Sequence, residues 1–356
     1  MESIARLMEE LPKDYETDSR TQGAFTSARG IKTPSDLMKL SIFHLHNESS
    51  LMEISEVARM TELGQVSDVA FMNRLAKCGD WFRSINEKIA AQSLIEYKKP
   101  KWMEGMTVVA LDVSDVKEGG RSQKLYRLHY AIDIFKMSRV EYKITTNEVG
   151  ESLCNFSPQP NHLQIGDRAY TTINGLEHCA AAGASYIMRL RKNSFTIRDE
   201  NGEKLDMLAL FATLKTEECL DISAYATNAK GKKIPIRVCA KRKTPQAIEE
   251  TQKKLKRKEQ TRQRKMLEET KTYNEYIIVV TNLDENIPAK EILEAYRLRW
   301  QIEIYFKRLK SILGCGVLPK RREDSALAWF NGKLMIALLI ETVIAKASFS
   351  PQGYGE

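Results

Sequence analysis

The sequence predicts an α/β protein: a mixed sheet covered by helices, with an all-helical N-terminal domain and a mainly β insertion. Three observations lead to this prediction. Residues 1–100 carry helical periodicity and end near Pro100 and Gly105. Three strand-like apolar runs then follow one another and give way to alternating strand and helix patterns. Finally, residues 194–275 combine short strand-like pieces with one long charged helix.

The N-terminal residues contain three clear helix patterns, Ser35–Leu45, Leu51–Met60 and Ser67–Ala76. Between the second and the third, Gly64 suits a turn, and Ser67 suits the N-cap position, where a hydroxyl accepts a free backbone N–H. These proportions fit a helix-turn-helix. An ordinary helical bundle explains the same pattern equally well.

The next region reads as five core strands with one helix between the last two. Thr172–Ala182 is the helix, and Gly183 ends it. The strands are Thr107–Val113, Tyr126–Asp133, Val140–Thr146, His162–Asp167 and Ser185–Leu190. Three consecutive strands followed by a strand–helix–strand unit predict a mixed sheet. This order is similar to the RNase H-like fold.

An insertion separates the fifth core strand from the helices that follow it. Its strand-like pieces are Phe195–Arg198, Leu220–Ala226 and Ile234–Ala240, and a charged helix is expected over Gln246–Thr270 before the strand Tyr276–Thr281. The predicted domains are therefore a helical domain (1–100), a catalytic core (101–193 and 276–346), the insertion (194–275) and a tail (347–356).

The positive charge of the chain is concentrated in one segment. The net charge is +8, and the window Lys241–Lys265 holds eleven Lys or Arg against three Glu. Such a block predicts contact with a polyanion, although a solvated charged helix is the alternative. The cations expected to make that contact are Lys253, Lys254, Lys256, Arg257 and Lys258.

Several classes of protein do not fit this composition. The six cysteines are scattered without a Cys-x-x-Cys pair, and the five histidines do not cluster with them, so neither a zinc site nor a disulfide framework is expected. The N-terminus is charged and lacks the pattern of a signal peptide. The apolar run Ala326–Ala345 contains Asn331, Lys333 and Glu341, which predicts a buried helix behind the core and not a membrane span.

The segment Tyr296–Lys310 carries the most informative pattern. If it is one helix, Tyr296, Arg299, Glu303 and Lys310 fall within an arc of roughly 60°. A separate apolar stripe faces the core, made of Ala295, Leu298, Ile302, Phe306, Leu309 and Leu313. An acid, two cations and a phenol on one stripe suit a site for a metal ion and phosphates. An exposed face with ordinary charge pairs is the alternative.

Two further acids follow apolar strands. Asp112 and Asp167 each stand where a predicted strand ends, where an acid taken alone is usually a turn or cap residue. With Glu303 they form a trio that can bind two divalent cations for phosphoryl transfer. Oxygen ligands favour Mg²⁺ or Mn²⁺. Asp115 is an alternative first acid beyond the predicted strand end.

These residues resemble the motifs of the DDE transposases of the insertion sequence 4 family. Asp112 within Ala110–Ser114 is similar to the first motif, and Asp167 within Gly166–Tyr170 is similar to the second, Asp-x-(Gly/Ala)-(Tyr/Phe). The third motif, Tyr-x2-Arg-x3-Glu-x6-Lys, supplies Glu303. The resemblance implies an RNase H-like core with a mainly β insertion, and two Mg²⁺ or Mn²⁺ ions held by the three acids.

The resemblance also implies contacts with DNA. Tyr296, Arg299 and Lys310 would hold phosphates near the cleaved bond, and Lys307 would extend that track. Trp300 would stack on a flipped base, although core packing is an equally plausible role. The implied partners are double-stranded DNA, namely terminal inverted repeats and target DNA, and a second copy of the chain in a synaptic dimer. A bacterial cytoplasmic, nucleoid-associated protein without membrane contact is expected.

Three functions are consistent with these features. The leading one is a transposase that cleaves DNA at the ends of its element and joins them to target DNA. The second is an RNase H-like nuclease without strand transfer. The third is a DNA-binding protein whose catalytic site has been repurposed, which the three intact acids argue against.

Overall fold

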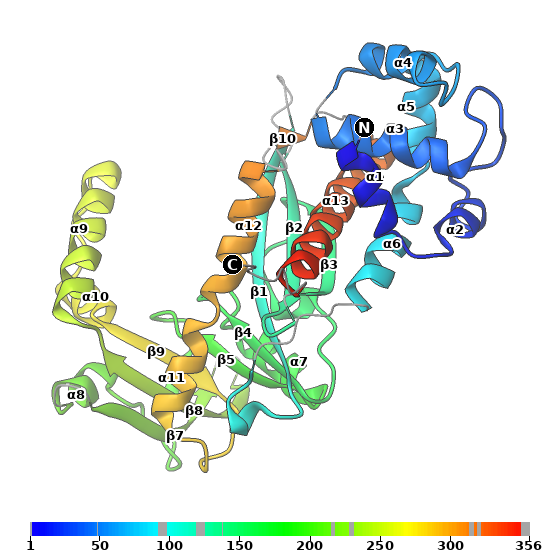
Figure 1. The fold of residues 1–356 in the computed structure, drawn as a ribbon. Helices are drawn as coiled ribbons and strands as arrows, with labels where there is room; N and C mark the ends of the chain where they lie inside the picture. The colour runs from blue at the N-terminus through cyan, green and yellow to red at the C-terminus, as the bar shows by residue number, and fades with distance from the viewer. Residues whose placement is uncertain are drawn as a thin grey trace, which may run out of the picture.

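The computed structural model of the chain describes residues 2–47, 49–91, 98–118, 125–136, 138–214, 218–227, 231–312, 317–318 and 322–349. Its centre is one mixed sheet, in the order β3-β2-β1-β4-β5-β9-β8-β7-β6, with β10 beside β1 (Figure 1). The strands are β1 (Thr107–Glu118), β2 (Leu125–Asp133), β3 (Ser138–Thr146), β4 (His162–Gly166), β5 (Ser185–Arg189), β6 (Thr196–Arg198), β7 (Cys219–Thr227), β8 (Lys233–Arg242), β9 (Tyr276–Thr281) and β10 (Val317–Leu318).

The first five strands adopt the arrangement that the sequence predicts. Strands β1, β2 and β3 are antiparallel neighbours, whereas β4 and β5 run parallel to β1. Helix α7 (Ile173–Ala181) connects β4 to β5 and begins where the Thr172 hydroxyl accepts the Gly175 N–H. Gly183, at φ +72°, follows its end, as expected. The predicted RNase H-like α/β class is confirmed.

The strands of residues 194–275 continue this sheet. Strand β9 is antiparallel to β5 on one side and to β8 on the other, so β8, β7 and β6 extend the same surface. The charged helix expected over Gln246–Thr270 is two helices, α9 (Pro245–Arg262) and α10 (Glu268–Asn274). The break falls at Gln263, which adopts a left-handed conformation with φ +49°. Figure 1 shows α9 standing away from the sheet.

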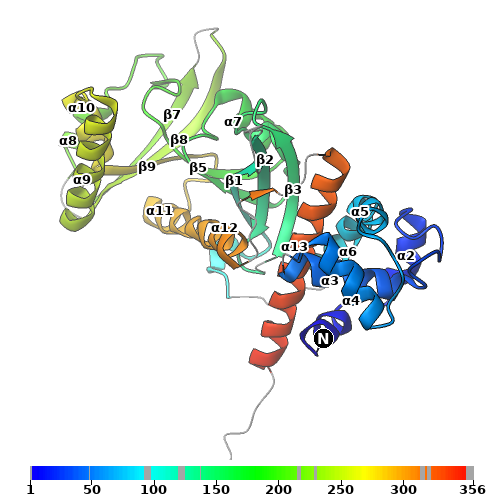
Figure 2. The same ribbon diagram turned by 90° about the horizontal axis from the view of Figure 1, so that it is seen from above.

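Helices cover both faces of the sheet, and alternate side chains along each strand serve one face or the other. On β1, Val108 and Ala110 pack with helices α11 (Ala289–Arg297) and α12 (Trp300–Ile312), while Val109 and Leu111 face the side of α7 and α8 (Met207–Ala212). The face of α11 and α12 is called the front face below. Figure 2 shows α11 and α12 together on that face, with α7 on the opposite one.

The N-terminal helices form as predicted. Ser50 and Glu53 make a capping box at the start of α4, and the Ser67 hydroxyl accepts the Ala70 N–H at the start of α5. In the turn between them, a side chain at Gly64 would collide with the carbonyl of Gly30. The helices are α1 (Glu2–Glu9), α2 (Tyr15–Thr21), α3 (Pro34–Asn47), α4 (Leu51–Met60), α5 (Asp68–Ala76) and α6 (Gly79–Ala91).

The long apolar helix α13 (Glu323–Phe349) packs mainly against these N-terminal helices. The expectation that it lies simply behind the catalytic core is therefore corrected: it joins the helical domain to the sheet (Figure 2). By length and composition Asp324–Ile344 is able to cross a membrane, but 67% of its most apolar stretch is buried in the fold. Asn331 and Lys333 are buried with it, as the predicted core helix requires.

Candidate active site

Asp112 and Asp167 lie side by side on neighbouring parallel strands. The last register pair between β1 and β4 is Ala110 with Ile165, so two further positions bring Asp112 opposite Asp167. The predicted strand end at Asp112 is wrong, because β1 continues to Glu118 and pairs with β2 throughout. It is the pairing with β4 that stops, since β4 ends at Gly166. The two carboxylates thus stand at the point where β4 ends and β1 continues without it.

Asp112 points toward the front face. Side chains alternate along a strand, so Asp112 shares the face of Val108 and Ala110, where helix α12 crosses β1. Asp115 has the opposite parity and pairs with Arg127, whose Nε lies 3.1 Å from its Oδ1. The alternative first acid therefore lies on the other face, away from the other two.

The predicted single helix over Tyr296–Lys310 is two helices, α11 and α12. Between them the backbone tightens into i→i−3 hydrogen bonds: the Leu298 N–H donates to Ala295 O (3.0 Å) and the Arg299 N–H donates to Tyr296 O (3.1 Å). The two helices follow one another end to end in Figure 1. The break turns Tyr296 into the core and leaves Glu303 on the first turn of α12.

The three acids come close enough together to affect one another. Burial, with smaller contributions from the negative charges of Asp167 and Glu303, raises the pKa of Asp112 to about 6. The Val113 N–H, which donates to Asp112 Oδ1 at 2.9 Å, and the charge of Arg299 act in the opposite direction. The site therefore gathers three carboxylates and one guanidinium.

Glu303 is held by Arg299, whose Nη2 donates to the Glu303 Oε1. The Glu303 side chain is 55% exposed and that of Arg299 only 16%. Burial lowers the pKa of Arg299, but Tyr296 and Glu303 outweigh that effect and raise it overall. Among the described residues no three acid, His or Cys side chains converge tightly enough to form a ready metal site.

The other predicted site residues fall into three groups. Tyr296 is buried, which contradicts its expected place on an exposed edge, and its hydroxyl has no hydrogen-bond partner among the described residues. Trp300 is 51% exposed, so core packing does not account for it. Lys307 is exposed on α12, and Lys310 lies on the same helix but its side chain is outside the described part.

The predicted basic residues all lie on α9, far along the sheet from the acids. None of the 18 residues of this helix, all of which the structure describes, is buried. Lys253 pairs with Glu249 on the preceding turn (2.7 Å), which is the ordinary charge pair that the alternative interpretation predicts. The block Lys253, Lys254, Lys256, Arg257 and Lys258 is exposed.

Three neighbours of the acids were not singled out as site residues from the sequence. Ser114 shares the front face with Asp112, and its hydroxyl is buried without a partner among the described residues. The buried Tyr170 hydroxyl also lacks one, and burial together with Asp112 raises the Tyr170 pKa. Glu151 follows β3, and burial together with Asp167 raises its pKa. Ser114 and Tyr170 stand in the two aspartate motifs, whereas no pattern marks Glu151.

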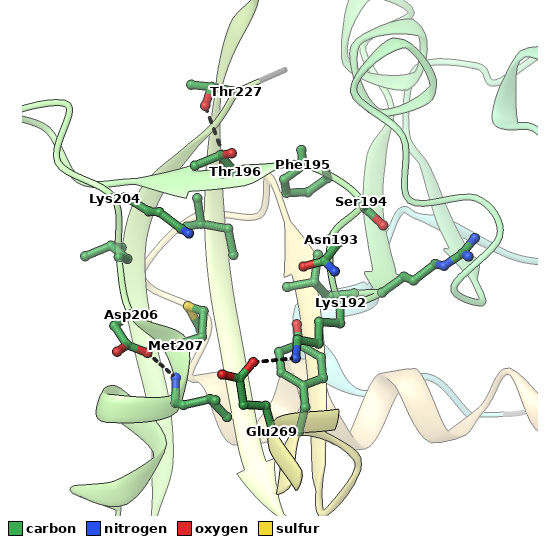
Figure 3. A pocket seen from close by; sticks show the side chains of 16 residues that line it. Lys192, Asn193, Ser194, Phe195, Thr196, Lys204, Asp206, Met207, Thr227 and Glu269 are labelled. Atoms are coloured by element: carbon green, nitrogen blue, oxygen red, sulfur yellow. Dashed lines mark hydrogen bonds and ion pairs between the residues drawn. The ribbon is translucent and has the colours of Figure 1, made fainter. Parts of the chain in front are cut away.

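A cavity of about 770 Å³ lies apart from the acids, between the turn after β5 and helices α8 and α10 (Figure 3). None of the three acids lines it. Lys192 and Glu269 point toward one another across it at 3.0 Å, and Asp206 accepts the backbone N–H groups that begin α8. Three of its charged side chains, Lys192, Glu269 and Asp206, are thus already engaged, and the carboxylate site remains the better candidate for catalysis.

The raised pKa of Asp112 has a measurable consequence for stability. With a folded pKa of about 6 and an unfolded pKa of about 4, the protein loses stability as the pH rises through this interval. Asp112→Asn abolishes that loss, so without metal it should raise the free energy of unfolding by about 2 kcal/mol at pH 7.5 and not at pH 3.5. Urea unfolding at both pH values tests this. Asp115→Asn, which breaks the pair with Arg127, is the control and should give no gain.

Comparison with known proteins places the chain among transposases. Residues 104–339 match the family model described as the transposase DDE domain. The chain is 26% identical over 352 residues to the putative transposase InsL for insertion sequence element IS186A of Escherichia coli (strain K12), covering 97% of this chain and 94% of that protein.

Two further relatives show the same relationship. The transposase for IS421 of Escherichia coli is 27% identical over 353 residues, covering 97% of this chain and 94% of that protein. The transposase for IS231E of Bacillus thuringiensis subsp. finitimus is 30% identical over 210 residues, covering 54% of this chain and 44% of that protein. With its acids gathered on an RNase H-like sheet and the domain match covering more than half of its length, the chain belongs to the transposase DDE domain family.

Proposed function

We propose that this chain is a DNA transposase of the insertion sequence 4 type, which cleaves DNA at the ends of its element and transfers those ends to target DNA. The observation that carries the proposal is the meeting of Asp112, Asp167 and Glu303 on one face of the sheet. Family membership supports it, because the relatives are named as transposases of insertion sequences.

The three acids suit divalent cations. Their carboxylate oxygens are ligands that Mg²⁺ and Mn²⁺ prefer, and the crowding that raises the pKa of Asp112 is relieved when cations bind. Asp112 and Asp167 would hold them first, and Glu303 would join after releasing Arg299. Two such ions would activate the attacking oxygen and stabilise the leaving oxygen.

The reaction follows from this arrangement. Water attacks a phosphodiester at the element's end, and the bond to the 3′ oxygen breaks to release a 3′ hydroxyl. That hydroxyl then attacks either the opposite strand, which forms a hairpin, or a target strand, and displaces another 3′ oxygen. The buried, positively charged Arg299 lies beside the acids and would hold a phosphate oxygen once Glu303 has moved.

Other parts of the chain would bind the rest of the DNA. Helix α9 presents its cations to solvent and would contact phosphates without reading sequence. The exposed Trp300 would stack on an unpaired base beside the acids. We propose the N-terminal helices as a further DNA-binding part and a dimer as the form that brings two ends together. Acting on bacterial DNA, the protein would work in the cytoplasm.

A strand-transfer assay distinguishes this function from that of a plain nuclease. Duplexes that carry the DNA flanking the reading frame, pre-cut to expose the 3′ hydroxyl, are incubated with the protein, Mg²⁺ and a supercoiled plasmid. We expect joined products that require the 3′ hydroxyl and disappear when it is replaced by hydrogen. Degradation of the plasmid without joining would instead favour the nuclease.

A further inference from the structure

Three cations gather beside the acids at the same edge of the sheet: Arg168, Arg189 and Lys243. We propose that this cluster is a phosphate-binding site, which holds the backbone of a DNA strand between the acids and helix α9. The inference rests on the proposed function, because the DNA strand held here is the one whose phosphodiester would be cleaved at the three acids. In the sequence Arg168 stands at the variable position of the second aspartate motif and Lys243 lies within the basic window Lys241–Lys265, whereas no pattern marks Arg189.

The sheet places the cluster at the level of the acids. Gly166 pairs with Met188, so one further position brings Asp167 opposite Arg189. Arg189 has the same parity as Ile187, which packs on the front face. Strands β5 and β8 are both antiparallel to β9, so Lys243, directly after β8, leaves the sheet at the same edge as Arg189. Asp112, Asp167 and Arg189 therefore form a row.

The cluster has no directly paired counter-charge: the Asp167 carboxylate acts on Arg168 and Glu275 acts on Lys243, but neither forms an ion pair with them. Among the described residues none of the three cations forms an ion pair, and the buried Nε of Arg189 has no hydrogen-bond partner. Arg168 donates through Nη1 and Nη2 to the Asn274 Oδ1, both at 3.1 Å. Lys243 Nζ donates to the Asn274 carbonyl (2.6 Å) and the Thr251 hydroxyl (2.9 Å). Neutral groups thus hold two of the cations in place and neutralise neither.

Holding like charges together is unfavourable without an anion. Burial, followed by the charges of Arg189 and Arg168, lowers the pKa of Lys243 to about 8, although Glu275 acts in the opposite direction. A purely structural role would explain why Arg168 and Lys243 bond to Asn274. It would not explain why the Nε of Arg189 is buried without a partner. A bound phosphate would supply the negative charge that these groups lack.

The cluster connects the acids with the basic helix. The phenol of Tyr296 lies near both Arg168 and Arg299. At the other end, the charge of Lys254 on α9 acts on Lys243. Positive charge therefore continues from Arg299 through the cluster to α9, along a path that a nucleic acid backbone is able to follow.

Binding of the full-length protein to DNA tests this inference without catalysis. The probe is a fluorescein-labelled duplex of 30 base pairs and arbitrary sequence, measured by anisotropy in EDTA over a series of salt concentrations. Arg189→Gln and Lys243→Gln should each reduce the slope of log K against log salt by about 0.9 and weaken binding about eightfold at 0.1 M salt. The matched control is Lys233→Gln, at the opposite end of β8, which should match the wild type.

Two further measurements separate binding from folding. Arg189→Lys keeps the charge and should retain the wild-type slope. Arg189→Gln removes one of three like charges, so its thermal midpoint should be no lower than that of the wild type. Slopes for Arg189→Gln and Lys243→Gln equal to that for Lys233→Gln would overturn the inference, as would a wild-type protein that does not bind the duplex. If the two variants show the expected slope change but the wild-type protein never cleaves DNA with Mg²⁺, only the proposed function would be contradicted.

Discussion

Asp112→Asn, Asp167→Asn and Glu303→Gln each remove Mg²⁺-dependent cleavage of the element's ends, by at least about 10³-fold, or roughly 4 kcal/mol of transition-state stabilisation. Each substitution keeps the size of the side chain and removes one negative charge from the trio that meets on the front face. The substitutions should weaken the binding of divalent cations more than the binding of DNA, because carboxylates hold the cations and do not bind phosphates themselves. Single-turnover cleavage of a labelled end duplex measures the effect.

The control for this series is Asp115→Asn. Asp115 lies three residues from Asp112 on the same strand but on the opposite face, where it pairs with Arg127. It should retain cleavage within a few fold of the wild type, and all four variants should bind the end duplex in EDTA as the wild type does. Cleavage by Glu303→Gln at the wild-type rate would contradict the proposed active site.

Asn331→Leu should lower the free energy of unfolding by about 2–4 kcal/mol. Asn331 is buried on α13, where its Nδ2 donates to the Gly79 carbonyl (2.9 Å) and its Oδ1 accepts from the Tyr142 hydroxyl of β3. Leucine fills the same volume, but it removes both hydrogen bonds, to the Gly79 carbonyl and from the Tyr142 hydroxyl. Because Asn331 links the helical domain, α13 and the sheet, the loss is expected to loosen the domain that α13 attaches.

Urea unfolding followed by tryptophan fluorescence measures the change, since Trp329 and Trp81 are both buried in this region. Thr342→Val is the matched control on the same helix. The Thr342 hydroxyl donates to the Leu338 carbonyl one turn earlier in the same helix (2.9 Å). Because this bond links no other element, its loss should change the free energy of unfolding by less than about 0.5 kcal/mol. A stability of Asn331→Leu within that limit would contradict the linking role.

The helix Tyr296–Lys310 shows how far sequence periodicity carries and where it stops. The apolar spacing places Ile302 and Phe306 in the core, as the structure confirms. The polar stripe, however, assumed an unbroken helix. Nothing in the local sequence, such as proline or glycine, marks the break at Leu298–Arg299. Tyr296 is buried because α11 packs on strands β5, β7, β8 and β9, whereas α12 continues over β1.

The strands show a similar division. Alternation along β1 identifies Asp112 and Asp115 as belonging to opposite faces, but it does not say which face is covered by which helices. That depends on where α12 and α7 pack. The end of β1 was misplaced because an acid in an apolar run looks like a strand end, whereas pairing with β2 continues past Asp112. The split of Gln246–Thr270 was likewise missed, because a left-handed residue such as Gln263 carries no sequence signal.

The sequence by itself determined most of the elements and the α/β class, and it singled out the three acids as candidates, because periodicity, capping residues and local motifs are properties of neighbouring residues. Only the tertiary structure decided which residues meet. The register of β4 between β1 and β5 puts Asp112, Asp167 and Arg189 in one row, and the packing of α13 joins the helical domain to the sheet. Such meetings depend on contacts between residues distant in the chain, and hydrophobic burial and strand pairing select those contacts without leaving a local pattern.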